Sequence, residues 1–566
     1  MTGFLPRMIY GTPVRPNKKA SIQSHFTSIE QLHYHPSILN ASAFHSILPY
    51  QTIDSDLMLL NNQSIGFGLH ILPVVELNQQ LISSLLELIK HQLPKDVDCT
   101  IMLHKHPYVH NRLKHGLQPM LAQVDYVDFA EMQFATHLTT LHDTRCYLFL
   151  STHRHSNDKD ILLDCRNLIE TIFTQAHITH ARIVESDFLI LIRSILTPDL
   201  YSTQWPALLD LENKSFNNQI IPSLNTWFIL NNDSVDVEFR NALNISTKTR
   251  IINCQIKSQS KDDAMQQIKT LDLACPFLIS FTVRGRNKAG THSSFYNLML
   301  FTTADNEKNH LNQAIQIYHA LGFNLELART TQWLCFLSSL PFFITEGYFH
   351  ELYLLGLIKK IASKNIINLM PISADSKGSP QGLLLPSHKQ QIAFLNTFDS
   401  QNYPINNFHY LIAAPCKNHI VELLSAKIMS GLALGEQIYL LDFDQSYKKL
   451  CNKIKGIYID AAILKRFFVP LDMLHNHLSG NKISFVIKKL KKIEQLLFHS
   501  IYAISKNVSF IVIDMSLLKH AAHSSTVLSI VFTILQSFQK SILTQKKRCI
   551  IDCAPRSLIN NNRHMK

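Results

Sequence analysis

Hydrophobic and polar positions along the chain follow patterns that predict intermixed strands and helices. Met58–Val74 contains two apolar runs broken by Asn61 and Asn62, which predicts a β-hairpin. Apolar residues at helical spacing between Asn78 and Gln92 predict a helix. Further strands are predicted at Thr100–Leu103, Cys146–Leu150, Trp227–Leu230 and Phe277–Thr282, and further helices at Ile161–Phe173 and Leu311–Leu321. This part of the chain is therefore expected to be α/β or α+β.

The beginning of the chain and two long apolar stretches bear on membrane association. Residues 1–45 mix Pro, Ser, Asn and His without a sustained period, so we expect an irregular lead-in. No apolar run of signal-peptide length occurs there, which favours a cytoplasmic protein. Trp333–Ile358 is interrupted by polar residues, and Ser525–Phe538 is shorter than the roughly 20 residues that a membrane span needs. We expect both stretches to be buried core.

The last part of the chain has the alternation of a parallel sheet. Its predicted elements are a strand at Phe408–Ala414, a helix at Ile420–Leu434 ended by Gly435, and strands at Gln437–Phe443, Phe510–Asp514 and Cys549–Asp552. The first three form a βαβ unit. A parallel sheet of this kind carries its ligands beyond the carboxyl ends of the strands.

The loop after the first of these strands has the outline of a phosphate-binding loop without its binding residues. The pattern G-x-x-x-x-G-K-[ST] needs glycines because backbone N–H groups surround the phosphates, a lysine to reach them, and a hydroxyl to hold Mg²⁺. The glycine, lysine and hydroxyl positions hold Ala414, His419, Ile420 and Val421, and Lys417 lies three residues before the usual lysine. We expect no ATP hydrolysis and no bound cofactor, although weak nucleotide binding and an unconventional active site are alternatives.

Hydrolysis also needs an acidic strand that holds Mg²⁺ and orients the attacking water. Asp552 follows three apolar residues and is the candidate for the metal-side carboxylate, but the next position holds Cys553 instead of Glu. Asp514 has the same outline and is followed by Met515. Neither strand therefore presents the required pair of acids.

The net charge and the Cys and His residues indicate which kinds of partner the chain could bind, but the charge alone does not choose between lipid and nucleic acid. Lys plus Arg number 54 against 42 Asp plus Glu, and the resulting +12 fits acidic lipid, nucleic acid or a solvated basic surface. Phe485–Phe498 predicts a basic amphipathic helix, either an exposed domain helix or a lipid-binding one. The ten cysteines include no C-x-x-C pair, and the 29 histidines have no organised companions, so we expect no metal site.

Four segments, taken in order, resemble the TraC-type ATPases of conjugative type IV secretion systems. They are Leu48–Val74, Ser339–Ile372, Gly435–Cys451 and Ile550–Leu558. The third is similar to the family pattern Asp-x-Gly-x-Ser-Tyr and keeps Asp442, Ser446 and Tyr447, with Asp444 in place of Gly. The fourth resembles the Walker B run I-I-D-E-A-W, with Cys553 in place of Glu.

The resemblance implies an α/β protein in which N-terminal α+β domains precede a RecA-like P-loop NTPase domain with a mainly parallel sheet. Family members continue beyond the Walker B run, whereas this sequence stops at Lys566, so the resemblance implies an incomplete motor domain. The implied segments are a lead-in at 1–45, an N-terminal α/β domain at 46–215, a middle mixed region at 216–385 and a truncated RecA-like domain at 386–566.

The family implies ATP and Mg²⁺ as cofactors, and conjugation components, copies of the chain and the inner-membrane surface as partners. Our leading hypothesis is a non-hydrolysing homologue of the pilus-assembly ATPase at the cytoplasmic base of the apparatus. The alternatives are a non-catalytic scaffold, a subunit that binds a membrane surface or nucleic acid, and an active ATPase with an unconventional site.

Overall fold

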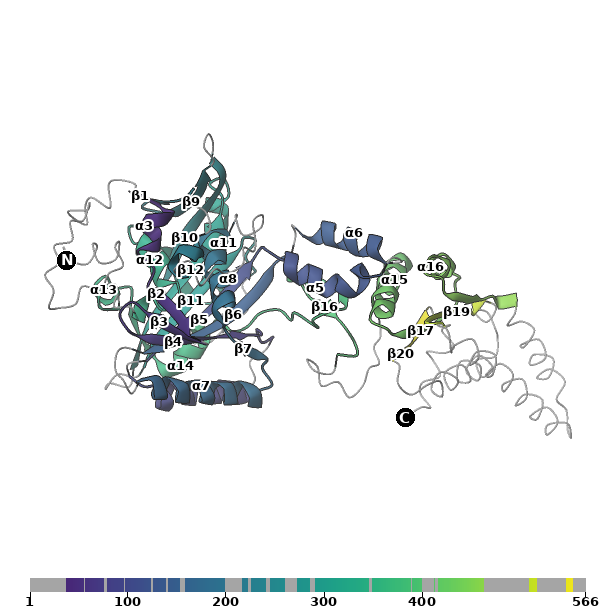
Figure 1. Cartoon of the computed structure of the whole chain (residues 1–566), viewed down its shortest axis with the longest axis horizontal. Helices are drawn as coiled ribbons and strands as arrows, with labels where there is room; N and C mark the ends of the chain where they lie inside the picture. The colour runs from purple at the N-terminus through teal and green to yellow at the C-terminus, as the bar shows by residue number, and fades with distance from the viewer. Residues whose placement is uncertain are drawn as a thin grey trace. The chain divides into compact units, whose positions relative to one another are not determined.

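The described part of the chain forms two compact units (Figure 1). The computed structural model describes residues 37–54, 56–75, 79–95, 97–123, 126–138, 141–152, 158–198, 216–221, 225–240, 245–259, 272–285, 291–345, 349–387, 389–399, 412, 416–462, 508–516 and 546–552. The first unit lies within residues 1–110, 140–377 and 386–392, and the second within 111–139, 378–385 and 393–566.

A 14-stranded antiparallel sheet dominates the first unit. Its strands are β1 (Ser37–Asn40), β2 (Tyr50–Asp54), β3 (Leu57–Leu60), β4 (Ile65–Ile71), β5 (Val97–His106), β6 (Asp143–Thr152), β7 (His180–Arg182), β8 (Thr226–Leu230), β9 (Val235–Arg240), β10 (Ile245–Gln259), β11 (Phe277–Arg284), β12 (Thr291–Thr302), β13 (Phe323–Leu327) and β14 (Lys359–Ala362). The main order is β1-β8-β9-β10-β12-β11-β5-β6-β4-β3-β2, with β13, β14 and β7 pairing outside this path. Strands from both sides of residue 216 therefore share one sheet.

Both faces of this sheet are covered, which explains why its central strands read as continuous apolar runs. Every residue of β5 is buried. Ile101 and Leu103 of this strand belong to one hydrophobic cluster, while Met102 between them belongs to another. Because successive strand residues point to opposite faces, the two clusters are the two cores on either side of the sheet.

Helices from widely separated segments cover the two faces. The first core includes residues of α4 (Gln79–Glu87), its π-helical continuation η1 (Leu88–Gln92), α7 (Asp158–Gln175), α11 (Glu307–Ala320) and α14 (Ser363–Leu369). The second includes residues of α3 (Ala41–His45), α8 (Glu185–Leu196), α10 (Phe216–Ile220), α12 (Gln332–Ser338) and α13 (Phe349–Leu354). The hairpin predicted at Met58–Val74 is confirmed as β3 and β4, and the helix predicted at Ile161–Phe173 as part of α7.

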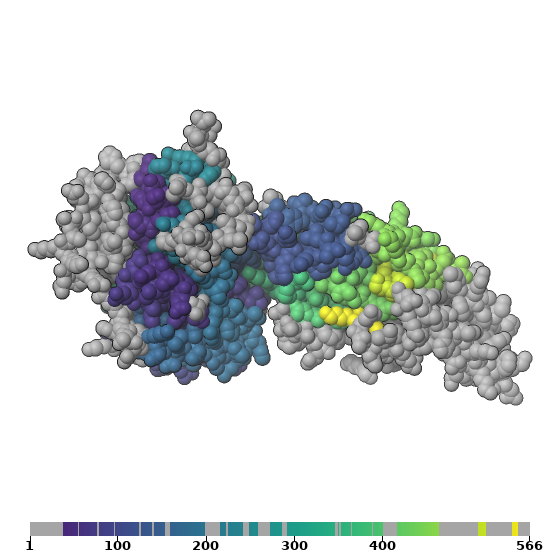
Figure 2. Space-filling view, viewed as in Figure 1, coloured from purple at the N-terminus to yellow at the C-terminus, as the bar shows by residue number. Residues whose placement is uncertain are grey.

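The second unit contains a four-stranded parallel sheet. Its strands are β17 (Gln437–Asp442), β18 (Ile457–Ile459), β19 (Phe510–Asp514) and β20 (Lys547–Asp552), in the order β18-β19-β17-β20. The unit also contains α5 (His110–Leu121), α6 (Val127–His137), α15 (Lys417–Ala433), α16 (Lys448–Lys453) and the small pair β15 (Leu383–Leu384) and β16 (Phe394–Leu395). Figure 2 shows the blue residues of α5 and α6 beside green residues of this unit, and the Gln123 side chain donates to the Ala433 carbonyl.

The predicted elements around the phosphate-loop outline are confirmed where the structure describes them. The helix predicted at Ile420–Leu434 is α15, and the strands predicted at Gln437–Phe443, Phe510–Asp514 and Cys549–Asp552 are β17, β19 and β20. Gly435 follows the helix with φ of +78°, a conformation that glycine adopts without strain. The strand predicted at Phe408–Ala414, apart from Ile412, and the basic helix predicted at Phe485–Phe498 lie outside the described residues.

The apolar stretch Trp333–Ile358 contributes α12 and α13 to the second core, as expected. One part of the prediction is wrong, because Tyr353, Leu354 and Leu355 are exposed. At the C-terminal turn of α13 only Leu352 packs on the second core, and the three residues that follow it face the solvent. Among the helices that the structure describes, none has the length and apolar character needed to cross a membrane.

Candidate functional site

Three aspartates end neighbouring strands of the parallel sheet in register. Asp442 at the end of β17 pairs with Asp514 of β19 on one side and with Asp552 of β20 on the other. All three residues are almost completely buried. Adjacent strands lie about 4.8 Å apart, so the three carboxylates form a row at the carboxyl edge of the sheet. This is the edge at which parallel α/β sheets bind their ligands.

The middle carboxylate holds the loop that follows β17. Oδ1 of Asp442 accepts hydrogen bonds from the backbone N–H groups of Asp444 at 3.1 Å and Ser446 at 3.2 Å. Its Oδ2 accepts from the N–H of Tyr447 at 3.0 Å, and the Tyr447 side chain is buried. The spacing of Asp442, Ser446 and Tyr447 therefore has a structural reason, since one buried acid satisfies three backbone donors. Asp442 acts as a positioning residue for this loop.

The same loop contacts the neighbouring aspartate. Gln445 has φ of +60°, which costs a non-glycine residue on the order of 1 kcal/mol. Its Nε2 donates to Asp514 at 2.8 Å, and the backbone N–H of Ser516 donates to Asp514 at 2.9 Å. Burial opposes ionisation of Asp514, but the hydrogen bonds from Ser516 and Gln445 outweigh it and hold the pKa of this carboxyl below its usual value.

An ion pair joins the phosphate-loop outline to the loop after β17. Lys417 is the first residue of α15, whose N-cap residue Cys416 makes no side-chain cap and whose first turn contains no acid. The ammonium of Lys417 donates to the carboxylate of Asp444. Asp444 thus supplies negative charge to the first residue of a helix whose N-terminus favours it. The Lys417 side chain is 41% exposed, so the pair contributes about 0–1 kcal/mol to stability.

The other predicted positions offer little polar chemistry. His419 is exposed in the first turn of α15, while Ile420 and Val421 are half-buried and apolar. Ala414 and Cys553 lie outside the described residues. The structure brings Lys417, Asp442, Ser446, Tyr447 and Asp552 to one edge of the parallel sheet. The sequence prediction missed the pairing of Lys417 with Asp444, which their opposite charges in two loops at the same sheet edge could have indicated.

Two of the three aspartates at this edge, Asp442 and Asp514, are engaged by hydrogen-bond donors of the chain and are not directed at an Mg²⁺ ion. Both oxygens of Asp442 accept backbone N–H groups, and Asp514 accepts from Gln445 and Ser516. Mg²⁺ instead needs carboxylate oxygens directed at the metal in octahedral geometry. Throughout the described part of the chain, no three His, Cys, Asp or Glu residues are grouped so as to hold a metal ion.

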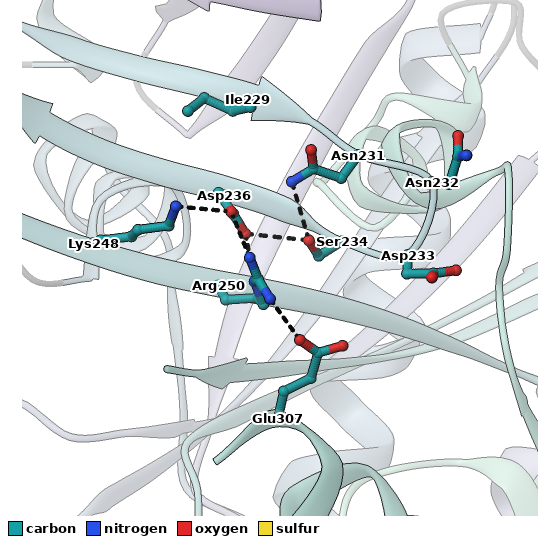
Figure 3. Close-up of a pocket in the computed structure, with 9 residues that line it drawn as sticks. All are labelled: Ile229, Asn231, Asn232, Asp233, Ser234, Asp236, Lys248, Arg250 and Glu307. Atoms are coloured by element: carbon teal, nitrogen blue, oxygen red, sulfur yellow. Dashed lines mark hydrogen bonds and ion pairs between the residues drawn. The ribbon is translucent and has the colours of Figure 1, made fainter. Parts of the chain in front are cut away.

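A polar cavity of about 480 Å³ lies in the first unit, between the β8–β9 turn, β10 and the start of α11 (Figure 3). Arg250 donates to Asp236 at 2.8 and 3.0 Å and to Glu307 at 2.6 Å. Lys248 also contacts Asp236, at 3.2 Å. The charges of these side chains largely neutralise one another. Their ion pairs connect β9, β10 and α11, so they stabilise the walls of the cavity.

Comparison with known proteins shows similarity to one sequence family. The family model described as TraC protein matches residues 44–233. Protein TraC of Escherichia coli (strain K12) is 22% identical over 504 residues, which cover 75% of this chain and 57% of that protein. The chain thus spans little more than half the length of this curated relative.

Proposed function

Because the chain is a TraC-type conjugative transfer protein, we propose that it serves in pilus assembly or substrate export as a subunit that does not hydrolyse ATP. It acts with other conjugation components at the cytoplasmic base of the apparatus. In this proposal the second unit is a RecA-like lobe, and segments 46–215 and 216–385 both contribute strands to the single sheet of the first unit. The ordered row of carboxylates at the edge of a parallel sheet supports this assignment of the lobe.

The ion pair between Lys417 and Asp444 carries the non-hydrolysing part of the proposal. Lys417 is the residue of the loop outline best suited to a phosphate, and its ammonium is held by a carboxylate of the same chain. A phosphate oxygen would have to displace Asp444 and would then face its negative charge. The positions where Lys and Ser or Thr are needed hold Ile420 and Val421, which have no group to replace them.

ATP turnover by the purified full chain tests this function. We expect phosphate release in the presence of Mg²⁺ to be the same for the chain and for its Asp552→Ala variant. We also expect ATP with Mg²⁺ to leave the midpoint of thermal unfolding unchanged, because a ligand that binds only the folded state would raise it. Turnover that disappears in Asp552→Ala would show an active, unconventional site and overturn the proposal.

A matched pair of variants separates the ion pair from the rest of the site. Asp444→Asn removes the internal carboxylate and leaves Lys417 unchanged, whereas Asp444→Asn combined with Lys417→Met removes both charges. If Asp444 blocks phosphate, inorganic triphosphate should bind the single variant more tightly than either the wild type or the double variant. Equal triphosphate affinity in the wild type, the single variant and the double variant would show that the ion pair does not prevent phosphate from binding to Lys417.

A further inference from the structure

The polar cavity of the first unit has more acidic than basic side chains in its lining. Its volume of about 480 Å³ is that of a small-ligand site. The charged residues that line it are the two cations Lys248 and Arg250 and the three carboxylates Asp233, Asp236 and Glu307. Three negative charges against two positive ones leave an excess of one negative charge in the lining.

Both cations of the lining already bind carboxylates of the chain. Arg250 donates through Nε, Nη1 and Nη2 to Asp236 and Glu307. Lys248 lies 3.2 Å from Asp236 and 2.9 Å from Glu238. Burial opposes ionisation of Asp236, but the hydrogen bonds from Arg250 and Lys248 outweigh it and hold the pKa of this carboxyl below its usual value. An anionic ligand would therefore have to compete with ionised carboxylates for both cations.

Two carboxylates at the cavity have oxygens that remain available to a ligand (Figure 3). Glu307, the first residue of α11, uses only Oε2 to accept from Arg250, and its Oε1 accepts no hydrogen bond from a described residue. Asp233, in the β8–β9 turn, is 58% exposed and lies 3.9 Å from Arg329, whose side chain is 78% exposed. Water screens an ion pair that is this long and this exposed, so a ligand can replace Arg329 at little cost.

Charged side chains next to the lining balance one another and leave this excess in place. Arg240 lies 2.8 Å from Glu238 on the same strand, and these two charges cancel. On either side of Glu307 in the sequence, Asp305 and Lys308 are both exposed and have opposite charges. The negative excess therefore belongs to the cavity itself, at Asp233 and Glu307.

We propose that this cavity binds an alkylguanidinium or alkylammonium group, the cation carried by arginine, lysine and small polyamines. The cation donates to Oε1 of Glu307, and Asp233 adds its negative charge in place of its contact with Arg329. The methylene groups of the ligand lie against Ile229, a half-buried apolar residue of the lining. A neutral ligand would leave the excess charge without a partner. The site lies in the first unit and does not depend on the nucleotide-site proposal, so either proposal can fail alone.

A ligand-observed NMR titration of the full chain tests the cavity. We expect Nα-acetyl-arginine methylamide to bind about tenfold more tightly than Nα-acetyl-citrulline methylamide, which has the same shape without the charge. Glu307→Gln should weaken binding of the arginine probe about fivefold, because it removes the charge and keeps an oxygen for Arg250. Asp305→Asn is the matched control, since Asp305 is exposed nearby but does not line the cavity, and this change should leave the affinity unaltered. Spermidine, titrated in the same way, shows whether a free polyamine or an arginine side chain fits better.

A second variant should act in the opposite direction. Arg329→Gln removes the side chain that competes for Asp233, so it should tighten binding of the arginine probe about twofold. Unchanged thermal unfolding of Glu307→Gln would show that its weaker binding is not a folding defect, and the comparison of the two probes on the wild type needs no variant. The proposal is overturned if the charged and neutral probes bind equally, if neither the arginine probe nor spermidine binds at millimolar concentration, or if Asp305→Asn weakens binding as much as Glu307→Gln.

Discussion

The antiparallel sheet of the first unit and the parallel sheet of the second both bury aspartates, and they use them differently. In the first, Asp98 of β5 receives two hydrogen bonds from Arg284 of the adjacent strand β11, at 2.6 and 2.7 Å. Asp143 of β6 likewise contacts Lys377 at 2.8 Å and Arg145 at 2.7 Å. In the second, Asp442 receives only backbone N–H groups at a strand end.

Buried aspartates therefore have two different structural roles in this protein. Side-chain ion pairs within the antiparallel sheet connect strands that are distant in the sequence and so fix the arrangement of the fold. The aspartates at the strand ends of the parallel sheet gather at one edge and shape loops, as in an architecture that presents a site, although Glu436 of the same unit forms a buried ion pair with Arg548. The predictions that follow test whether the first unit depends on its buried charges more than the second.

Acidification should produce the largest effect, and it should act on the first unit. Burial is the main cause that lowers the pKa of three histidines of this unit, and nearby positive charges add to it. The pKa of His70 falls to about 4, with Lys377 and Arg145 as the nearby charges. That of His104 falls to about 3, with Arg145 nearby, and that of His142 to about 4, with Lys105 nearby. Below the unfolded value of 6.5 the unfolded chain binds more protons, so stability falls as pH drops from 6.5 toward 4. Each histidine should remove about 1.4 kcal/mol per pH unit.

Tryptophan fluorescence in urea measures this loss, because all three tryptophans, Trp205, Trp227 and Trp333, precede the second unit's sheet in the sequence. His104→Gln should flatten the pH dependence of the unfolding free energy by about 1.4 kcal/mol per pH unit. His319→Gln is the control, since His319 is exposed on α11 of the same unit. Equal slopes in the wild type and His104→Gln would show that this histidine is not buried in its neutral form.

Asp98→Ala should follow in magnitude, with a loss of about 3 kcal/mol in the free energy of unfolding. Its carboxylate also accepts from Thr345 at 3.0 Å, so the change leaves Arg284 and Thr345 without this acceptor. The same fluorescence measurement applies. Asp233→Ala is the matched control, because Asp233 is 58% exposed and lies 3.9 Å from Arg329. Similar losses from both substitutions would contradict the role assigned to the buried pair.

The sequence predicted the strands of both sheets more readily than their assembly. Apolar runs such as Phe277–Thr282 and Phe510–Asp514 have the length and composition of buried strands, and both are strands. Pairing of β11 with β5 joins residues about 180 positions apart, and no local pattern contains such a contact. The exposure of Tyr353–Leu355 escaped prediction for a related reason, since hydropathy reports composition but not which side of a short helix meets the core.

For the candidate site, the sequence indicated residue types but not their partners. The positions of Asp442, Ser446 and Tyr447 were singled out by resemblance, whereas their physical connection, one carboxylate binding successive backbone N–H groups, depends on the fold of the loop. The register of Asp442 with Asp514 and Asp552 likewise follows only from strand pairing.

Asp442→Ala should destabilise the second unit by about 2 kcal/mol, less than the loss expected for Asp98→Ala, because water can satisfy part of the released loop. Hydrogen exchange should show faster exchange at the amides of Asp444, Ser446 and Tyr447. Ser446→Ala is the control, because Ser446 donates to Asp442 through its backbone N–H, which alanine retains. Unchanged exchange in Asp442→Ala would mean that the loop is held by other contacts.

The smallest effect should come from the ion pair that bears most directly on function. Lys417→Met should change the free energy of unfolding by less than about 1 kcal/mol, because the lysine side chain is 41% exposed and water screens its contact with Asp444. The corresponding change at a buried pair, Arg284→Met, should cost several times more, since it leaves Asp98 uncompensated in the interior. Urea unfolding of both variants, followed by circular dichroism, makes the comparison. A large loss in Lys417→Met would show that the pair is needed to fold the loop. Displacement of Asp444 from Lys417 by a phosphate would then be disfavoured because it unfolds the loop, and not because the phosphate competes with the Asp444 charge.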